Sequence, residues 1–237
     1  MMQVADSTGG PNGLSYVENE RSVGRRLGVA IEERYEAILR AARDVVARRG
    51  FHHASIREIA RSAGLSLAGL YHYVGGKDEL LFLVLDRSLD RLIAALDRAL
   101  AGASTADEKL LALVRTHLEF GFSQAAALKV INRDHDLLDE PARGEIAAKR
   151  QAYLQRGLEV LRELDPCGRS TEALLSATNL LLGMLNGIAT RPFLRADGDA
   201  DALAREVGAL FLHGFLPSSP VLAGVGTEVA GGNGTWP

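Results

Sequence analysis

Apolar residues recur every three or four positions along most of this chain, which is the period of an α-helix. Glycine and proline interrupt the pattern at intervals and set the expected helix ends. The pattern predicts nine helices, at about 32–49, 56–63, 67–73, 77–100, 105–122, 124–132, 141–164, 171–189 and 200–215. The two-residue alternation of a half-buried strand is absent from the sequence. The sequence therefore predicts an all-α protein.

Two of these helices are short and are joined by a tight turn. Ser55 precedes the first of them and Glu58 follows three positions later, which is the pattern of a capping box at a helix N-terminus. Gly64 permits the left-handed backbone that ends a helix, and Ser66 is placed to cap the next one. Two short helices joined in this way are typical of the helix-turn-helix, whose second helix enters the major groove of DNA.

The distribution of charge supports a DNA-binding segment. The whole chain has a formal net charge of −3, which by itself argues against nucleic acid. From Arg21 to Lys77, however, eleven Lys and Arg stand against five Asp and Glu, which gives +6 and leaves −9 for the rest. A basic segment on an acidic chain is the pattern expected when one part of a protein meets phosphate. A merely solvated charged face would explain the charge equally well if the helix-turn-helix were not beside it.

The same segment resembles the DNA-binding domain of the TetR family of bacterial transcriptional regulators. The matching residues are Gly50-Phe51, Ser55, Ile59-Ala60, Ala63-Gly64-Leu65-Ser66, Leu70-Tyr71-His72-Tyr73 and Lys77-Asp78-Glu79-Leu80. Two positions depart from the family pattern: Val74 stands where Phe is usual, and Gly76 replaces a polar residue before Lys77. The resemblance implies a homodimer that binds a palindromic double-stranded DNA operator. It also implies a three-helix DNA-binding head, followed by a six-helix body with a ligand pocket among its middle helices and a four-helix dimer interface.

We therefore divide the chain into four segments. Residues 1–28 lack periodicity and are expected to form a flexible arm with a basic end, and residues 29–77 to form the helix-turn-helix domain. Residues 78–216 are expected to form the ligand-binding and dimerisation domain, and the Gly- and Ser-rich residues 217–237 a disordered tail.

The expected DNA contacts cluster at the start of the second short helix and around it. The side chains in its first turn offer no bidentate donor, so direct readout there means apolar contact with thymine methyl groups or a close backbone approach. Other positions match phosphate-contacting residues of the family, and a basic arm can reach the minor groove. The expected contacts are Arg26, Ser55, Ser66, Leu67, Ala68, Gly69, Tyr71, His72 and Lys77.

The body loosely resembles TetR-family members that respond to acyl-CoA thioesters. The similarity lies in Asn132 to Arg150, in Leu182-Gly183-x-x-Asn186-Gly187 and in Arg191-Pro192-Phe193. One position differs: this chain has Pro192-Phe193 where those proteins often carry Trp-Tyr. It implies a small apolar or acyl-CoA-like effector that releases a repressor from DNA. Arginines would meet its phosphates, and asparagines seven apart on one helix face would orient a carbonyl, although local capping explains the asparagines equally well. The candidate ligand-binding residues are His117, Phe120, Asn132, Arg150, Asn179, Asn186 and Arg191.

The last two helices are the expected dimer interface, because the helix at 171–189 is apolar nearly all round and needs more than one neighbour to cover it. The candidate interface residues are Leu182, Gly183, Met184, Leu210 and Phe211.

Other functions are less well supported by the sequence. Asp134, His135 and Asp136 are metal-ligand types and leave a metal-sensing regulator as an alternative, although metal-site spacing such as His-Glu-x-x-His is missing and we expect no metal. A DNA-binding regulator or architectural protein without a ligand, and a ligand-sequestering body with a vestigial head, also remain open. Gly-rich phosphate loops and nucleophile motifs are lacking, so we expect no enzyme and no cofactor.

The sequence also sets an expected location. The single cysteine, Cys167, excludes an internal disulfide and fits a reducing compartment. We find neither a continuous run of about 18 apolar residues nor a secretory signal pattern over residues 1–19. We therefore expect a cytoplasmic, nucleoid-associated bacterial protein without a membrane partner.

Overall fold

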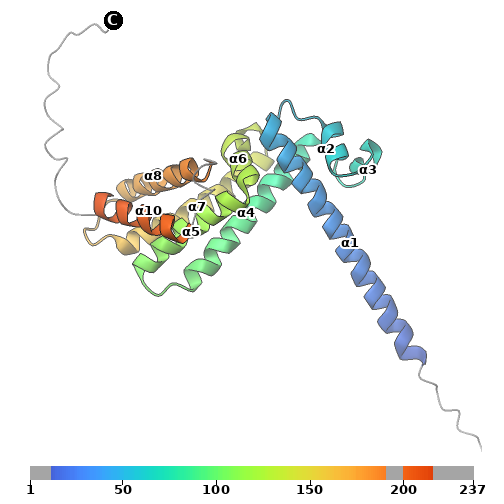
Figure 1. Ribbon diagram of the computed structural model, residues 1–237, viewed down its shortest axis with the longest axis horizontal. Helices are drawn as coiled ribbons and strands as arrows, with labels where there is room; N and C mark the ends of the chain where they lie inside the picture. The colour runs from blue at the N-terminus through green and yellow to red at the C-terminus, as the bar shows by residue number, and fades with distance from the viewer. Residues whose placement is uncertain (1–11, 191–199, 216–237) are drawn as a thin grey trace, which may run out of the picture. The chain divides into compact units, whose positions relative to one another are not determined.

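The computed structural model describes the main chain of residues 12–190 and 200–215, and the side chains of residues 30–190 and 200–214. Within these residues every regular element is a helix, which confirms the all-α prediction (Figure 1). The order is α1 (Asn12–Arg49), α2 (Ile56–Ser62), α3 (Leu67–Tyr71), α4 (Lys77–Ala101), α5 (Ala106–Ser123), α6 (Ala125–Arg133), the 3₁₀ turn η1 (His135–Leu137), α7 (Ala142–Leu164), α8 (Thr171–Ala189) and α10 (Ala200–Phe215).

The first helix is longer than the sequence pattern predicts. We expected it to begin near Glu32 and to follow a flexible arm over residues 1–28, but α1 is helical from Asn12 onward. Three glycines lower the helix propensity of this stretch, yet it contains no proline, and adding residues to an existing helix costs far less than starting one. The helix ends as predicted at Gly50, whose φ of 81° is left-handed. Residues 1–11 and the tail 217–237 lie outside the described residues.

The chain forms two compact units, which we call the head and the body. The head comprises the chain up to Arg87 together with Lys129–Arg143, and the body comprises Ser88–Leu128 and the chain from Gly144 onward. The division therefore falls elsewhere than the predicted boundary at residues 77 and 78. Helices α4, α6 and α7 each contain residues of both units.

The head is built around the two short helices. α1 packs against α2, and α2 packs against α3 (Figure 1). Ile38, Ile59 and Leu70 supply fully buried side chains from these three helices. Gly64 has a φ of 69°, and the hydroxyl of Ser66 accepts a 3.0 Å hydrogen bond from the Gly69 N–H, so the predicted turn and cap are confirmed.

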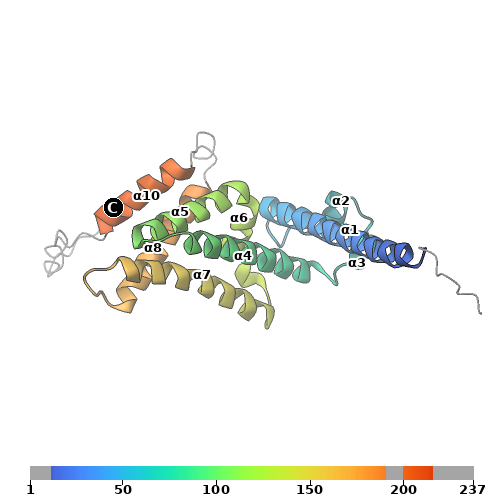
Figure 2. The same ribbon diagram turned by 90° about the horizontal axis from the view of Figure 1, so that it is seen from below.

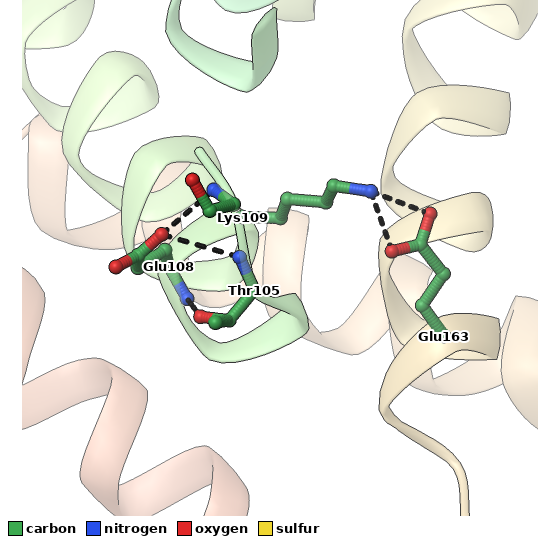
Figure 3. Close-up of polar contacts among 5 residues, drawn as sticks. Thr105, Glu108, Lys109 and Glu163 are labelled. Carbon is green, nitrogen blue, oxygen red and sulfur yellow. Dashed lines mark hydrogen bonds and ion pairs between the residues drawn. The ribbon is translucent and has the colours of Figure 1, made fainter. Parts of the chain in front are cut away.

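The capping box predicted at the start of α2 is not formed. The Ser55 side chain makes no capping hydrogen bond, although its backbone has the extended conformation of an N-cap residue. Glu58 is drawn away because its carboxylate accepts a 3.1 Å hydrogen bond from Arg49 Nε. A capping box is present instead at α5, where Thr105 and Glu108 exchange hydrogen bonds, as Figure 3 shows.

A polar contact at the end of α6 links residues 129–143 to α1 within the head. Asp134 is 3% exposed, and its carboxylate accepts two hydrogen bonds from the Arg133 guanidinium, of 2.9 and 2.6 Å. Arg133 Nη2 also donates a 2.7 Å hydrogen bond to the carbonyl of Val46 in α1. A buried carboxylate needs such a partner, because an unpaired one would be strongly destabilising. The hydrogen bond to Asp134 raises the pKa of Arg133 in return.

The body is a helix bundle in which α8 and α10 both pack against α5 (Figures 1 and 2). α4 and α7 run side by side in the same direction, as Figure 2 shows. Two ion pairs agree with this: Asp90 pairs with Lys149, and seven residues further along each helix Asp97 pairs with Arg156. The core is formed mainly by leucines of α4, α5, α7 and α8, namely Leu92, Leu96, Leu110, Leu113, Leu118, Leu158, Leu161, Leu174, Leu181 and Leu185.

Two glycines set the close approach of α8 to its neighbours. A Cβ atom added to Gly121 of α5 would overlap the Cβ of Ala189, and one added to Gly157 of α7 would lie 2.9 Å from the Thr178 methyl group. Both glycines are buried. The helices therefore cross more closely at these two points than any larger residue would allow.

Candidate nucleic-acid interface and buried polar site

The recognition helix α3 presents a small and nearly uncharged surface. Ala68, Tyr71 and His72 are exposed, and the Tyr71 side chain is a large apolar group left half in solvent. Leu67 and Gly69 are partly buried, and Ser66 is occupied by its capping bond. These residues offer a thymine methyl group an apolar partner and the backbone a close approach. Ser55 is exposed at the start of α2. These residues remain predicted DNA contacts.

Lys77 has a second set of partners that the sequence did not reveal. Its Nζ lies within hydrogen-bond distance of the carbonyl oxygens of Phe51 (3.0 Å), Ala54 (3.3 Å) and His52 (3.5 Å). The ammonium also lies 4.4 Å from the centre of the Phe51 ring. An ammonium has three N–H donors, so a DNA phosphate would have to compete with these carbonyls.

The helices α1 and α2 also carry exposed positive charge. Five arginines of these helices are exposed and make no hydrogen bond or ion pair with the described residues: Arg34, Arg40, Arg48, Arg57 and Arg61. Unpaired guanidinium groups are the donors that neutralise phosphates and release counterions. The main chain of Arg26 lies in α1, but its side chain is outside the described residues.

The body contains a polar network of two buried side chains and one partly buried side chain where three helices meet. His117 of α5 is 3% exposed and Tyr153 of α7 is 6% exposed. His117 Nδ1 lies 3.0 Å from the Tyr153 hydroxyl, and Nε2 lies 3.2 Å from Asn186 Oδ1 of α8. An amide oxygen only accepts hydrogen bonds, so Nε2 carries the ring proton and Nδ1 accepts from the Tyr153 hydroxyl. The sequence predicted His117 and Asn186 in one site.

Burial keeps this network uncharged. It lowers the pKa of His117 from its ordinary 6.5 to about 4, and the hydrogen bond to Asn186 opposes that shift only in part. Burial likewise raises the pKa of the Tyr153 hydroxyl. The network is therefore neutral throughout the physiological pH range and is surrounded by the leucine core. The sequence pattern did not single out Tyr153, because a tyrosine on the apolar face of a helix is usually an ordinary core residue.

The other predicted ligand-binding residues lie in several different environments. Asn179 is exposed and donates its amide to the Leu175 carbonyl of its own helix, which is the local role that the sequence also allowed. Asn132 is exposed and belongs to the head. Phe120 packs against the body core, and Arg150 is partly buried. Arg191 lies outside the described residues.

The predicted dimer residues divide into an exposed group and a buried one. Leu210 is 65% exposed and Gly183 is exposed, whereas Leu182 and Met184 are partly buried against the body core. Phe211 is only 7% exposed and belongs to the core of its own body, so the chain does not offer it at the surface. The pattern missed Leu180, which is also 65% exposed.

The metal-sensing alternative finds little support in the geometry. Both carboxylate oxygens of Asp134 are bonded to Arg133, and His135 Nε2 lies 3.1 Å from Asp136. Among the described residues, no group of three or more His, Cys, Asp or Glu side chains is placed to hold a metal ion.

One described helix, α8, is long and apolar enough to cross a membrane when only length and composition are considered. Its sequence is not a continuous apolar run, because serine, threonine and asparagine interrupt the apolar residues. Core helices of globular proteins commonly pass the same test.

Comparison with known proteins places the chain in a family. Residues 38–84 match the model described as bacterial regulatory proteins, tetR family, and residues 103–215 match the tetracyclin repressor-like C-terminal domain. Together the two matches cover about two thirds of the chain.

Individual relatives agree with this match. The chain is 32% identical over 126 residues to the HTH-type transcriptional activator FasR of Mycolicibacterium smegmatis, which is 52% of this chain and 57% of FasR. The match thus spans little more than half of that curated relative. A TetR-family transcriptional regulator from Bordetella parapertussis has a similar structure, with a TM-score of 0.70, 29% identity and coverage of 76% of this chain and 95% of that one.

A further solved structure shares the fold. FadR of Bacillus subtilis in complex with stearoyl-CoA aligns with a TM-score of 0.63 and 22% identity, over 76% of this chain and 98% of FadR. The helix-turn-helix, the helical body and the two family matches lead to one conclusion: the chain belongs to the TetR family of DNA-binding transcriptional regulators.

Proposed function

We infer that the protein is a homodimeric repressor that a small apolar effector with a neutral hydrogen-bonding group, such as an acyl-CoA thioester, releases from its operator. The observation that carries the effector half of this proposal is the neutral network of His117, Tyr153 and Asn186 inside a leucine core. A ligand carbonyl or hydroxyl can exchange hydrogen bonds with such a network without burying a charge. A carboxylate or ammonium group would be strongly disfavoured there.

The fold is compatible with this effector class. FadR, which shares the fold, was crystallised with stearoyl-CoA, and that finding concerns FadR itself. In this chain the acyl portion would lie against the apolar residues around the network, and Arg150 and Arg191 remain our candidates for the coenzyme A phosphates. One relative, FasR, is described as a transcriptional activator, so whether this protein represses or activates transcription has to be measured.

A route from the body to the head is available along α6. This helix contains residues of both units, and Arg133 at its end donates to the Val46 carbonyl in α1. A shift of α6 on effector binding would disturb this bond and the buried Asp134 that depends on the same guanidinium. Effector and DNA would then each weaken the binding of the other by the same factor.

The exposed apolar side chains of α8 and α10 favour a second copy of the chain as their partner. Only a third of the most apolar 18-residue stretch of α8 is buried, and Leu180 and Leu210 are both 65% exposed. Gly183 and Gly187, on the exposed side of α8, leave open space where a Cβ would be, which allows another helix to come close. A two-fold dimer also supplies the second recognition helix that a palindromic operator needs.

A coupled titration tests the effector proposal. Binding to the DNA upstream of the protein's own coding sequence is measured by fluorescence anisotropy, with and without stearoyl-CoA or isovaleryl-CoA. We expect a saturating thioester to weaken DNA binding about 5- to 150-fold. Tyr153→Phe, which removes one hydroxyl from the network, should reduce this factor, and Tyr35→Phe in the head should not. Thioester binding without any change in DNA affinity would contradict release and favour a regulator without this ligand.

Light scattering tests the dimer. Leu180→Glu combined with Leu210→Glu places two carboxylates of each chain opposite those of its mate, and we expect monomers that retain helical circular dichroism. Glu145→Lys, a charge change at an exposed position of α7 outside the proposed interface, serves as the control and should leave the dimer intact. A stable dimer of the double variant would place the interface elsewhere.

A further inference from the structure

We propose that the corner between the end of α1 and the start of α2 binds a phosphate of the DNA backbone, outside the major groove that α3 enters. This corner is a groove lined by Arg48, Arg49, His53 and Glu58. The proposal rests on the DNA-binding function above and assigns to the head a contact that the sequence analysis did not include.

The position of the corner follows from the local structure. Arg48 and Arg49 form the last turn of α1, and His53 lies in the loop that Gly50 begins with its left-handed backbone. All three side chains are exposed. The loop brings this end of α1 beside the start of α2, the first helix of the helix-turn-helix. In this motif the first helix crosses the DNA backbone, so the groove adjoins the expected path of a phosphate chain.

The two arginines are not needed to satisfy the end of α1. Basic residues in the last turn of a helix commonly bond its free carbonyls. Here the carbonyl of Val46 accepts from Arg133 Nη2 at 2.7 Å. The carbonyls of Phe51 and Ala54 accept from Lys77 Nζ, at 3.0 and 3.3 Å. Arg133 therefore serves a carbonyl in the last turns of α1 and Lys77 serves the loop that follows, while the arginines of the corner do neither.

Glu58 holds one of these arginines without exhausting it. Its carboxylate accepts a 3.1 Å hydrogen bond from Arg49 Nε, which leaves the four N–H groups of the two Nη atoms. A guanidinium fixed at Nε and open at its Nη atoms suits a phosphate, which arginine binds through paired N–H groups. With His53 neutral, two arginines and one glutamate give the corner a net charge of +1. The corner is thus basic and at the same time held in place.

The rest of α2 carries the same sign of charge. Arg57 and Arg61 are exposed, lie four residues apart on one face of the helix, and make no ion pair with the described residues. The first helix of the motif therefore adds two exposed positive charges to those of the corner. A polyanion with evenly spaced phosphates complements such a surface better than a single small anion does.

The salt dependence of binding to a short duplex of random sequence tests the proposal, because backbone contacts do not require the operator. Each phosphate that the protein neutralises contributes about 0.9 to the slope of log K against log salt concentration. We expect Arg48→Gln with Arg49→Gln to flatten the slope by about 0.9 for each phosphate that the variant no longer binds. Arg48→Lys with Arg49→Lys, which keeps the charge, should retain most of the slope. Arg98→Gln with Arg162→Gln, at two exposed arginines of the body, is the matched control for removal of two charges.

A change of opposite sign completes the test. Glu58→Gln raises the net charge of the corner from +1 to +2, and we expect it to tighten binding to the random duplex. The proposal is overturned if the double glutamine variant at Arg48 and Arg49 keeps the wild-type slope, or if Arg98→Gln with Arg162→Gln flattens the slope equally. Thermal melting of each variant establishes that the head remains folded, since an exposed ion pair contributes little stability. A wild-type protein that binds no duplex at all would instead contradict the DNA-binding function itself.

Discussion

The head and the body use their basic side chains in opposite ways. In the head, five exposed arginines of α1 and α2 have no partner among the described residues. In the body, basic side chains join helices: Lys149 to Asp90, Arg156 to Asp97 and Lys109 to Glu163. The Lys109 pair, shown in Figure 3, ties α5 to α7 directly beside the capping box that starts α5.

The difference shows what each unit has to do. A surface that binds a polyanion gains affinity from cations whose only competitors are water and salt. In a bundle, cations that are paired with carboxylates of a neighbouring helix help to fix how α4, α5 and α7 align with one another. The hydrogen bond from Arg156 lowers the pKa of Asp97, as expected for a carboxylate held in its charged form. The exposed arginines of α1 and α2 thus face solvent, and the three cations of the body named above are neutralised by carboxylates of neighbouring helices.

The largest effect should come from the close helix crossing of the body, which has no counterpart in the head. Gly121→Val places its side chain where Ala189 already lies, and we expect a loss of about 3 kcal/mol or more in the free energy of unfolding. Urea denaturation measures this loss. Gly214→Ala, in open space on α10, should change stability by no more than about 1 kcal/mol. Equal effects of the two changes would show that α8 is free to move away from α5.

The buried histidine should make the stability of the body depend on pH. The pKa of His117 is about 4 in the folded protein and about 6.5 when exposed, so the unfolded chain binds a proton more readily between these values. Stability should therefore be full above about pH 6.5 and fall by on the order of 3 kcal/mol as the pH drops toward 4. Denaturation at a series of pH values, compared with His117→Gln, isolates the effect. A variant with the same profile as the wild type would assign the pH dependence to other groups.

Substitution of Lys77 tests whether this charge in the head has a structural role or binds DNA. Lys77→Ala removes a donor shared by three carbonyls, and we expect a loss of about 1–2 kcal/mol in stability. We also expect a smaller change in the salt dependence of DNA binding than the double substitution at Arg48 and Arg49 causes. Lys129→Ala, an exposed lysine of the same unit, is the control and should leave stability unchanged. If Lys77→Ala flattens the salt slope by about 0.9, the value for one phosphate, Lys77 binds a phosphate as the sequence analysis expected.

The smallest effect should come from the ion pairs of the body. Lys109→Met breaks the contact with Glu163, which is 48% exposed, so we expect a loss of no more than about 1 kcal/mol. DNA binding and its salt dependence should not change. Arg57→Gln in α2 should show the reverse pattern, with weaker DNA binding and unchanged stability. If both variants behave alike, the contrast between the two units is wrong.

Local signals of the sequence determined the helices and the turn of the DNA-binding head. The 3.6-residue period of apolar side chains places every predicted helix from residue 56 onward, because a helix with one apolar stripe leaves that period in the sequence. Gly50, Gly64 and Ser66 act within a few residues of themselves, so their turns and cap were predictable. The start of α1 was not, because helix propagation depends on residues further along the chain rather than on a local signal.

Tertiary structure decided which side chains meet. Glu58 pairs with Arg49 and not with the backbone beside Ser55, because the loop after α1 returns the chain to that arginine. Tyr153 lies 36 positions from His117 in the sequence, and Asn186 lies 69 positions from it, so helix spacing alone could not join them. Burial likewise withdrew Phe211 into the core and left Leu180 outside. The sequence by itself determined the helices, the family and the sign of charge on the head. Long-range packing decided which charges stay free, which polar groups are buried together, and which apolar faces are left for a partner.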